Sequence, residues 1–219
     1  MQTRRPWLRR ASVTAVSAAA LVAMAAPADA TTTAQASTAT AQASTAATTA
    51  TSTAAAVDYA TWQKDCQAVM DQALPYLKQR IAAAKPGEKQ AIVLDIDNTA
   101  LETDFGFSYP QPANKPVLEV ARYAQERGVA LFFVTARPDI IQSFTEYNLK
   151  QAGYQVSGLY VRNFIDLFKN VAEYKTAQRV DVEKKGYTII ANIGNSATDL
   201  SGGHAEKTYK LPDYDGQLS

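Results

Sequence analysis

The chain has 219 residues, and its 22 basic residues nearly balance its 21 acidic ones. A chain so close to neutral lacks the basic surplus that binds nucleic acid or an anionic membrane surface, so we expect neither as a partner. Cys66 is the only cysteine, which excludes an internal disulfide. We expect Cys66 to be a buried apolar position on a helix.

Residues 1–30 have the pattern of an export signal peptide. Four arginines precede an alanine-rich apolar stretch, and Ala28-Asp29-Ala30 fits a cleavage site between small residues. The apolar stretch is too short and too weakly apolar for a membrane span, so we expect a secreted protein with no stable membrane anchor after cleavage. The arginine pair Arg4-Arg5 fits either a general secretory (Sec) or a twin-arginine signal, and the residues leave that route open.

Residues 31–56 are almost wholly Ala, Thr, Ser and Gln, with no charged or aromatic side chain. Such a segment cannot bury enough apolar surface to offset its ordering entropy, so we expect a disordered linker. Residues 57–219 then form one folded domain. Without the signal peptide the chain has a net charge of −2.

From Asp58 onward, hydrophobic periodicity predicts alternating helices and strands. The first buried strand covers residues 90–95, and its apolar run leads directly into Asp95 and Asp97. Residues 98–116 form an irregular, aromatic loop suited to a flap over a site. The other predicted strands are residues 130–134, 159–161, 187–193 and an edge strand at 207–211, and the predicted helices are 58–84, 117–127, 138–151 and 170–185. This alternation is typical of an α/β domain with a mainly parallel sheet.

Chemically active side chains follow several of these strands. Crossover helices place the carboxyl ends of parallel strands at one edge of the sheet, so these groups can converge. The groups are Asp95, Asp97 and Thr99 after the first strand, Thr135 after the second, Lys175 on a helix, and Asn195 and Asp199 after the fourth.

These residue types fit the transfer of a phosphoryl group. A carboxylate can attack phosphorus, and a second carboxylate two residues on can protonate the leaving oxygen. Mg²⁺ prefers oxygen ligands and relieves the repulsion between carboxylate and phosphate. We expect Thr135 to Pro138 to form the start of a helix whose free N–H groups hold phosphoryl oxygens, while Lys175 neutralises the remaining charge.

Four segments, in order, resemble the four motifs of the haloacid dehalogenase (HAD) superfamily of phosphatases. They are Asp95-Ile96-Asp97-Asn98-Thr99, Phe132-Phe133-Val134-Thr135-Ala136-Arg137, Tyr174-Lys175-Thr176, and the stretch from Asn192 to Leu200. Their flanks are similar to the class B-like acid phosphatases (subfamily III), a group that includes secreted bacterial acid phosphatases and plant vegetative storage proteins. These flanks are Glu146-Tyr147-Asn148-Leu149, Ala152-Gly153-Tyr154, Lys184-Lys185-Gly186-Tyr187 and Tyr209-Lys210-Leu211-Pro212.

The resemblance implies a Rossmann-like, three-layer α/β/α domain with a five-stranded sheet and a small or absent cap. It implies an Mg²⁺-dependent acid phosphatase that hydrolyses small phosphomonoesters. Asp95 is then the nucleophile and Asp97 the general acid and base, with Thr135 and Lys175 binding phosphate. The implied Mg²⁺ ligands are Asp95, the carbonyl of Asp97, position 195 and Asp199. Arg137 either reaches the substrate phosphate or is a rim charge.

Position 195 departs from the family pattern, because the family usually has Asp where this chain has Asn195. An amide brings an oxygen but no charge, so we expect weaker Mg²⁺ binding. The alternative function is a weakly catalytic or non-catalytic binding or storage protein on the same scaffold. The residues do not indicate the oligomeric state.

The remaining expectations concern the flap and the only histidine. Phe105, Phe107 and Tyr109 either stack on an aromatic leaving group or pack the flap onto the domain. Glu102 and Asp104 shape the loop. His204 is expected to be a surface residue near the fourth motif.

Overall fold

The computed structural model describes residues 56–106 and 108–218. The predicted signal peptide, all but the last residue of the predicted linker, and Phe107 lie outside the described residues. No described helix is both long enough and apolar enough to cross a membrane.

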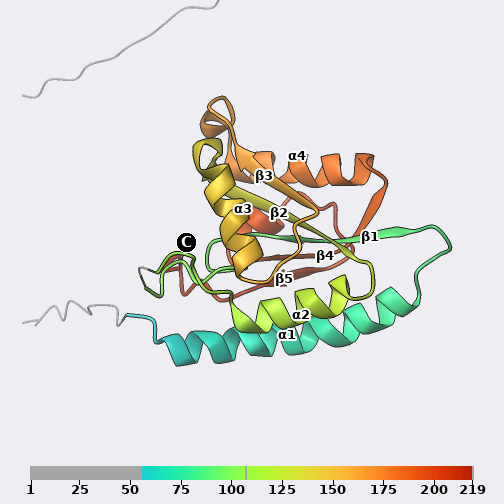
Figure 1. Ribbon diagram of the computed structural model, residues 1–219, viewed down its shortest axis with the longest axis horizontal. Coiled ribbons are helices and arrows are strands. Elements are labelled where there is room, and N and C mark those ends of the chain that lie inside the picture. The colour runs from blue at the N-terminus through green and yellow to red at the C-terminus, as the bar shows by residue number, and fades with distance from the viewer. Residues whose placement is uncertain (1–55, 107, 219) are drawn as a thin grey trace, which may run out of the picture. The chain divides into compact units, whose positions relative to one another are not determined.

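Helices and strands alternate along the described chain, as the periodicity predicts (Figure 1). The strands are β1 (Lys89–Leu94), β2 (Ala130–Pro138), β3 (Gly158–Arg162), β4 (Tyr187–Gly194) and β5 (Thr208–Lys210). The helices are α1 (Tyr59–Ala82), α2 (Lys115–Gln125), α3 (Gln142–Gln151), α4 (Val171–Lys184) and α5 (Ala197–Leu200), with short 3₁₀ turns η1 (Asp139–Ile141) and η2 (Asp166–Phe168).

The five strands form one sheet in the order β3-β2-β1-β4-β5, and every pair is parallel. The prediction of a mainly parallel five-stranded sheet is therefore confirmed. Successive strands move outward from β1 on one side, and the chain then returns to place β4 against the other side of β1. This reversal is a topological switch point, and such points are where open α/β sheets bind ligands.

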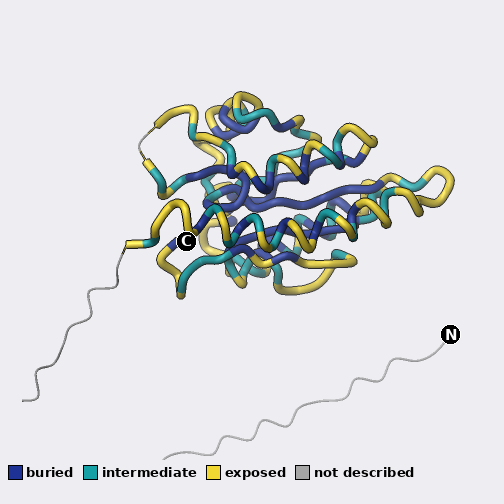
Figure 2. The backbone as a smooth tube through the Cα atoms, turned by 90° about the horizontal axis from the view of Figure 1, so that it is seen from below, coloured by how far each residue is buried: buried dark blue, intermediate teal, exposed yellow. Residues whose placement is uncertain are grey.

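Helices cover both faces of the sheet and complete three layers (Figure 1). Ile92 and Leu94 of β1 face α1 and α2 in the larger core, whereas Ala91 and Val93 face Tyr174 of α4 in a smaller core. The alternation follows from the two-residue period of a strand, with both faces apolar because both are covered. Figure 2 shows the strands as the buried centre and the helices with exposed outer sides.

Three helices, α1, α4 and α5, begin where a polar side chain caps their free N–H groups, and the caps of α1 and α4 hold the two longer ones. The Asp58 carboxylate accepts a hydrogen bond from Thr61 N at 2.8 Å at the start of α1. The Asn170 side chain accepts one from Ala172 N at 2.8 Å at the start of α4. Cys66 lies fully buried on α1, as expected, and burial raises the pKa of its thiol to about 12.

One predicted boundary is wrong. Pro138 does not begin the α-helix after β2, because β2 itself extends to Pro138 and pairs with Arg162 of β3 beyond an irregular register. The 3₁₀ turn η1 follows, and α3 begins only at Gln142. The predicted helix start that would hold phosphoryl oxygens at Thr135 to Pro138 is therefore extended strand.

The segment between β1 and α2 contains only isolated β-bridges, so the described residues hold no large cap in this segment. Phe105 of this segment stacks on Trp62 of α1 at a centroid distance of 4.4 Å and meets Tyr59 edge-on at 5.3 Å. For Phe105 the packing interpretation is thus the right one. Phe105 and Trp62 attach the flap to the outer helix.

Trp62 provides a stability test of this attachment. Its side chain is fully buried, and its indole N–H has no hydrogen-bond partner within the described part of the chain. We expect Trp62→Ala to lower the free energy of unfolding by about 3–5 kcal/mol, because it empties a large buried site. Trp62→Phe removes the unsatisfied N–H donor and part of the buried apolar area. It is expected to lower the free energy of unfolding by less than about 1.5 kcal/mol. Urea unfolding measures both; equal losses would contradict this account of the site.

Candidate active site

A cavity of about 330 Å³ opens at the carboxyl ends of β1, β2 and β4. It therefore lies at the switch point of the sheet, where the sequence places its chemically active side chains. Its walls come from the end of β2, from the segments that follow β1 and β4, and from the N-terminal parts of α4 and α5. The lining residues are Asp95, Asp97, Thr103, Asp104, Ala136, Arg137, Val171, Lys175, Asn195, Ser196 and Thr198.

A buried ammonium group joins two buried carboxylates beside this cavity. The Nζ atom of Lys175 lies 2.7 Å from Oδ1 of Asp95 and 2.5 Å from Oδ1 of Asp199. The side chains come from α4, the end of β1 and α5, which are far apart in sequence. Each is buried, so the two ion pairs are little screened by solvent.

Burial controls the protonation of this triad. Removal from water raises the pKa of Asp95 to about 7, although the nearby Lys175 opposes this shift. Burial also disfavours the Lys175 ammonium, but the two carboxylates outweigh that effect and raise the pKa of Lys175 above its usual value. The ammonium therefore stays charged between the two acids.

Asp199 is held in place from both its side chain and its backbone. Its Oδ2 accepts a hydrogen bond from Ser196 N at 2.8 Å, which closes a capping box at the start of α5. Its carbonyl oxygen accepts from Arg179 Nη1 at 2.7 Å and from Asn192 Nδ2 at 2.8 Å. Asp199 does not line the cavity and reaches it through Lys175.

Asp97 lies at the cavity wall and is more accessible than Asp95. Its carboxylate accepts hydrogen bonds from Arg137 Nη2 at 2.7 Å and Nε at 3.1 Å, and from Thr103 Oγ1 at 2.9 Å. Arg137 also donates to Gln111 Oε1 at 2.9 Å. Arg137 is thus paired with the predicted acid and base inside the cavity and is not an isolated charge at its rim.

The other predicted residues differ in their positions. Asn195 lines the cavity, and its Oδ1 accepts from Thr99 Oγ1 at 3.3 Å. Thr135 is fully buried and accepts from Arg137 N at 3.1 Å, but it is not on the cavity wall. Its role in phosphate binding stays a prediction. His204 is exposed and pairs with Glu183 at 2.7 Å, as a surface residue would.

Several cavity residues were not predicted from the sequence. Thr103, Ser196 and Thr198 bring hydroxyl groups to the wall or its frame. Thr103 has no sequence signal, since it is one threonine in an irregular loop. Asp104 was expected to shape the loop, and it does so by accepting from Asn98 Nδ2 at 2.7 Å, but it also lines the cavity.

The oxygen atoms gathered at this site are of the kind that bind a hard divalent cation. No group of three His, Cys, Asp or Glu side chains suited to a metal ion occurs in residues 56–106 and 108–218. The carboxylates of Asp95 and Asp199 nevertheless flank one cationic atom, the Nζ of Lys175, and the amide of Asn195 lines the cavity together with Asp95. Two carboxylates and an amide oxygen are ligands that Mg²⁺ accepts.

Comparison with known proteins places the chain in a family. The family model described as HAD superfamily, subfamily IIIB (acid phosphatase) matches residues 14–111 and 108–217. The chain belongs to this family. The matched ranges contain all four segments that carry the resemblance in the sequence, and the predicted family and fold are confirmed.

Curated relatives of this acid phosphatase family match part of the chain. The stem 28 kDa glycoprotein of Glycine max is 38% identical over 89 residues, which are 39% of this chain and 35% of the relative. Acid phosphatase 1 of Solanum lycopersicum is 29% identical over 103 residues, which are 46% of this chain and 40% of that protein. The matched region thus spans less than half the length of these relatives.

A solved structure shares the fold. The class C acid phosphatase from Bacillus anthracis superposes with a TM-score of 0.57 at 16% identity, covering 72% of this chain and 80% of that chain. At this identity the likeness concerns the architecture: a three-layer α/β/α arrangement around a parallel sheet.

Gly194 gives a first prediction at this site. A Cβ added there would lie 2.4 Å from Cβ of Asp199, so a methyl group must displace the buried acid. We expect Gly194→Ala to lower the free energy of unfolding by roughly 1–3 kcal/mol beyond any backbone effect. A loss below about 0.5 kcal/mol in Gly194→Ala, measured by urea unfolding, would show that the contact with Asp199 is not decisive.

The buried Asp95 predicts a pH dependence for the metal-free protein. Its raised pKa means that the folded state holds a proton more tightly than the unfolded chain, so stability falls as pH rises from about 4 to about 7. The loss is roughly 1.4 kcal/mol for each pKa unit.

Asp95→Asn mimics the neutral acid and tests this directly. With a chelator present, the variant should match the parent near about pH 4 and exceed its stability increasingly from about pH 5 to about pH 8. Thermal unfolding across this range is the measurement, with Asp71→Asn on the exposed face of α1 as control. An unchanged pH profile in Asp95→Asn would assign the dependence to other groups.

Proposed function

We propose that this protein is an exported, Mg²⁺-dependent phosphomonoesterase that acts through an aspartyl-phosphate intermediate. Membership of the acid phosphatase family supports the reaction class. The observation that carries the proposal is the pairing of Asp95 and Asp199 with Lys175 beside a cavity that also contains Asp97. Export is supported by the sequence pattern of residues 1–30.

The chain's own residues divide the work in the following way. An oxygen of Asp95 attacks phosphorus, the bond to the leaving oxygen breaks, and Asp97 gives that oxygen a proton. Asp97 then takes a proton from water, whose oxygen attacks phosphorus and releases phosphate and Asp95. Lys175 keeps a positive charge next to the attacking carboxylate, and Arg137 orients Asp97. When bound by Asp95, the Asp97 carbonyl, Asn195 and Asp199, Mg²⁺ would supply the charge that offsets repulsion between carboxylate and phosphate.

A second cavity indicates the kind of leaving group. It has a volume of about 410 Å³ and shares Asp97, Thr103 and Arg137 with the first cavity. Tyr109 and Phe144 are among its other lining residues. A phosphate held in the first cavity would therefore direct its ester group toward an aromatic wall, which favours aryl or other flat, apolar leaving groups.

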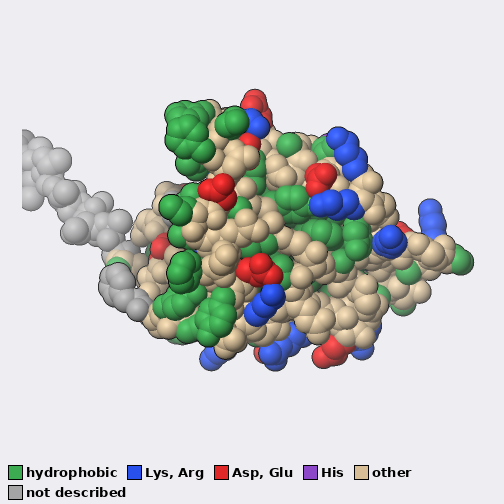
Figure 3. All heavy atoms as spheres, turned by 45° about the horizontal axis from the view of Figure 1, so that its top comes forward, with side chains coloured by type: hydrophobic (Ala, Val, Ile, Leu, Met, Phe, Trp, Pro, Cys, Tyr) green, Lys and Arg blue, Asp and Glu red, His purple; other side chains and the backbone are tan. Residues whose placement is uncertain are grey.

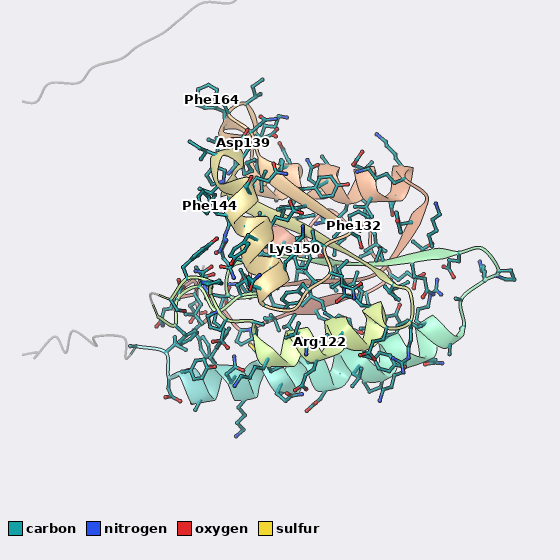
Figure 4. The ribbon with its side chains drawn as sticks, in the orientation of Figure 1. Arg122, Phe132, Asp139, Phe144, Lys150 and Phe164 are labelled. Carbon is teal, nitrogen blue, oxygen red and sulfur yellow. The ribbon has the colours of Figure 1, made fainter. Side chains whose placement is uncertain are left out.

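The surroundings of this wall are apolar as well. Nine of the ten exposed large hydrophobic side chains among the described residues fall in residues 109, 140–147 and 164–168. Figure 4 places Phe144 and Phe164 at the same end of the molecule, and Figure 3 shows hydrophobic side chains on the surface there. Tyr109 packs on Tyr147 and Phe144, with ring centroids 6.3 and 6.4 Å away, yet it stays exposed at the cavity, so its contacts are compatible with both flap packing and stacking on a leaving group.

Turnover of p-nitrophenyl phosphate tests the proposed reaction. We expect hydrolysis with Mg²⁺ and its loss in excess EDTA, reversed by added Mg²⁺. Asp95→Asn should lose activity by on the order of 10³-fold or more, because no other group replaces the nucleophile. The control variant Asp71→Asn should keep full activity, since Asp71 lies on α1 and bonds to Gln67.

Two outcomes would contradict the proposal. Activity that survives Asp95→Asn would exclude the aspartyl-phosphate route. A folded protein that binds inorganic phosphate without turning over any ester would favour the alternative, a binding or storage protein. The amide at Asn195 and the lack of a three-acid cluster among the described residues are the observations that keep this alternative open.

A further inference from the structure

The last residues of the described chain fold back against the catalytic edge of the sheet. Leu211 N donates to Gly194 O at 2.9 Å, directly after β5. The chain then turns sharply and returns, so that Leu218 is buried in the core shared with α1 and α2. We call residues 213–218 the C-terminal hook.

The turn within the hook is strained. Tyr214 and Asp215 have φ angles of 50° and 57°, in the left-handed region that side chains other than glycine rarely adopt. Such a turn persists only where contacts on both sides fix it. Tyr214 Oη donates to Asp65 Oδ2 of α1 at 2.8 Å on one side. On the other side, the carbonyl oxygen of Leu218 accepts from Asn195 Nδ2 at 2.6 Å.

The contact with Leu218 requires the side chain at position 195 to offer a hydrogen-bond donor. A carbonyl oxygen can only accept, so the NH₂ end of the Asn195 amide must face it. The other end, Oδ1, accepts from Thr99 Oγ1 at 3.3 Å, at the close of the loop that carries Asp95 and Asp97. One buried amide therefore joins the catalytic loop after β1, the loop after β4 and the hook.

We propose that Asn195 is a positioning residue that fastens the C-terminal hook to the active site, and that the carbonyl of Leu218 is the reason why an amide stands at this position. An ionised Asp would place a carboxylate oxygen, which has no hydrogen to donate, against that carbonyl oxygen. The hydrogen bond to Leu218 would be lost, and a charge would be buried without a partner on that side. The amide at position 195 brings no negative charge to the proposed metal site, but it holds the hook in place. The effect on catalysis rests on the proposed function, whereas the structural link does not.

A set of stability measurements in a chelator tests the link without any assay of activity. In the full chain, Asn195→Asp should lower Tm by about 5 °C. In a chain that ends at Gly216, the carbonyl of Leu218 is gone, and the same substitution should change Tm by less than about 1 °C. Leu218→Ala is the matched control, because it removes the apolar side chain but keeps the carbonyl, so the cost of Asn195→Asp should persist in it.

An equal cost of Asn195→Asp in the full and shortened chains would overturn the proposal and place the penalty in repulsion with Asp95 and Asp199. Hydrogen exchange gives a second test that needs no shortened chain. Asn195→Ala should increase exchange in residues 214–218 by about tenfold or more while β1 stays protected. Unchanged exchange there would also overturn the proposal.

Kinetics separate positioning from general stability. Well below its Tm, Asn195→Ala should lower kcat about tenfold and leave KM for p-nitrophenyl phosphate within about twofold, because the substrate contacts remain while the catalytic loop loses its support. A change confined to KM would contradict the positioning role. If the parent protein itself shows no turnover, the proposed function fails, and the stability and exchange measurements still decide the role of the hook.

Discussion

The placement of Lys175 between Asp95 and Asp199 is the contact on which the catalytic edge depends. Two carboxylates this deeply buried repel one another and lose hydration, so the edge tolerates them only because an ammonium group lies within 2.7 Å of both. The ion pairs are weak evidence for stability in themselves. Their structural value is that three separate elements, β1, α4 and α5, must be in register for the charges to meet.

The sheet topology explains why that register is reliable. The reversal of strand order puts β1 beside β4, so the loops after these strands share one edge and need no long excursion to meet. Asp95 N donates to Ile193 O at 3.0 Å, which continues the ladder right up to the site. Asp95, the proposed nucleophile, is thus held by backbone pairing on one side and by Lys175 on the other. This frame fixes the position of its carboxylate without a large cap among the described residues.

Much of this arrangement could be predicted from the sequence, because it follows local patterns. Apolar runs marked the buried strands, and the Asp95-x-Asp97 spacing at the end of one of them marked the site. The position of Pro138 was predicted wrongly because a proline can either begin a helix or lie at the end of a strand. Its pairing with Arg162 of β3 decides between the two, and that contact joins two strands that no local pattern relates. The pairings of Arg137 with Asp97 and of Asn195 with Leu218 were beyond reach for the same reason, since each joins residues that no local pattern relates.

The position of β4 inside the sheet, between β1 and β5, has a consequence for synthesis. During translation β1, β2 and β3 leave the ribosome long before β4, and until then one edge of β1 has no partner. The loop after β1 is made early, but the loop after β4 that completes the cavity is made only after β2, β3 and α4. The cavity therefore cannot form until β4 has been synthesised. Parallel pairing between segments so far apart in sequence also slows folding. The chain therefore stays unfolded for longer before the cavity forms.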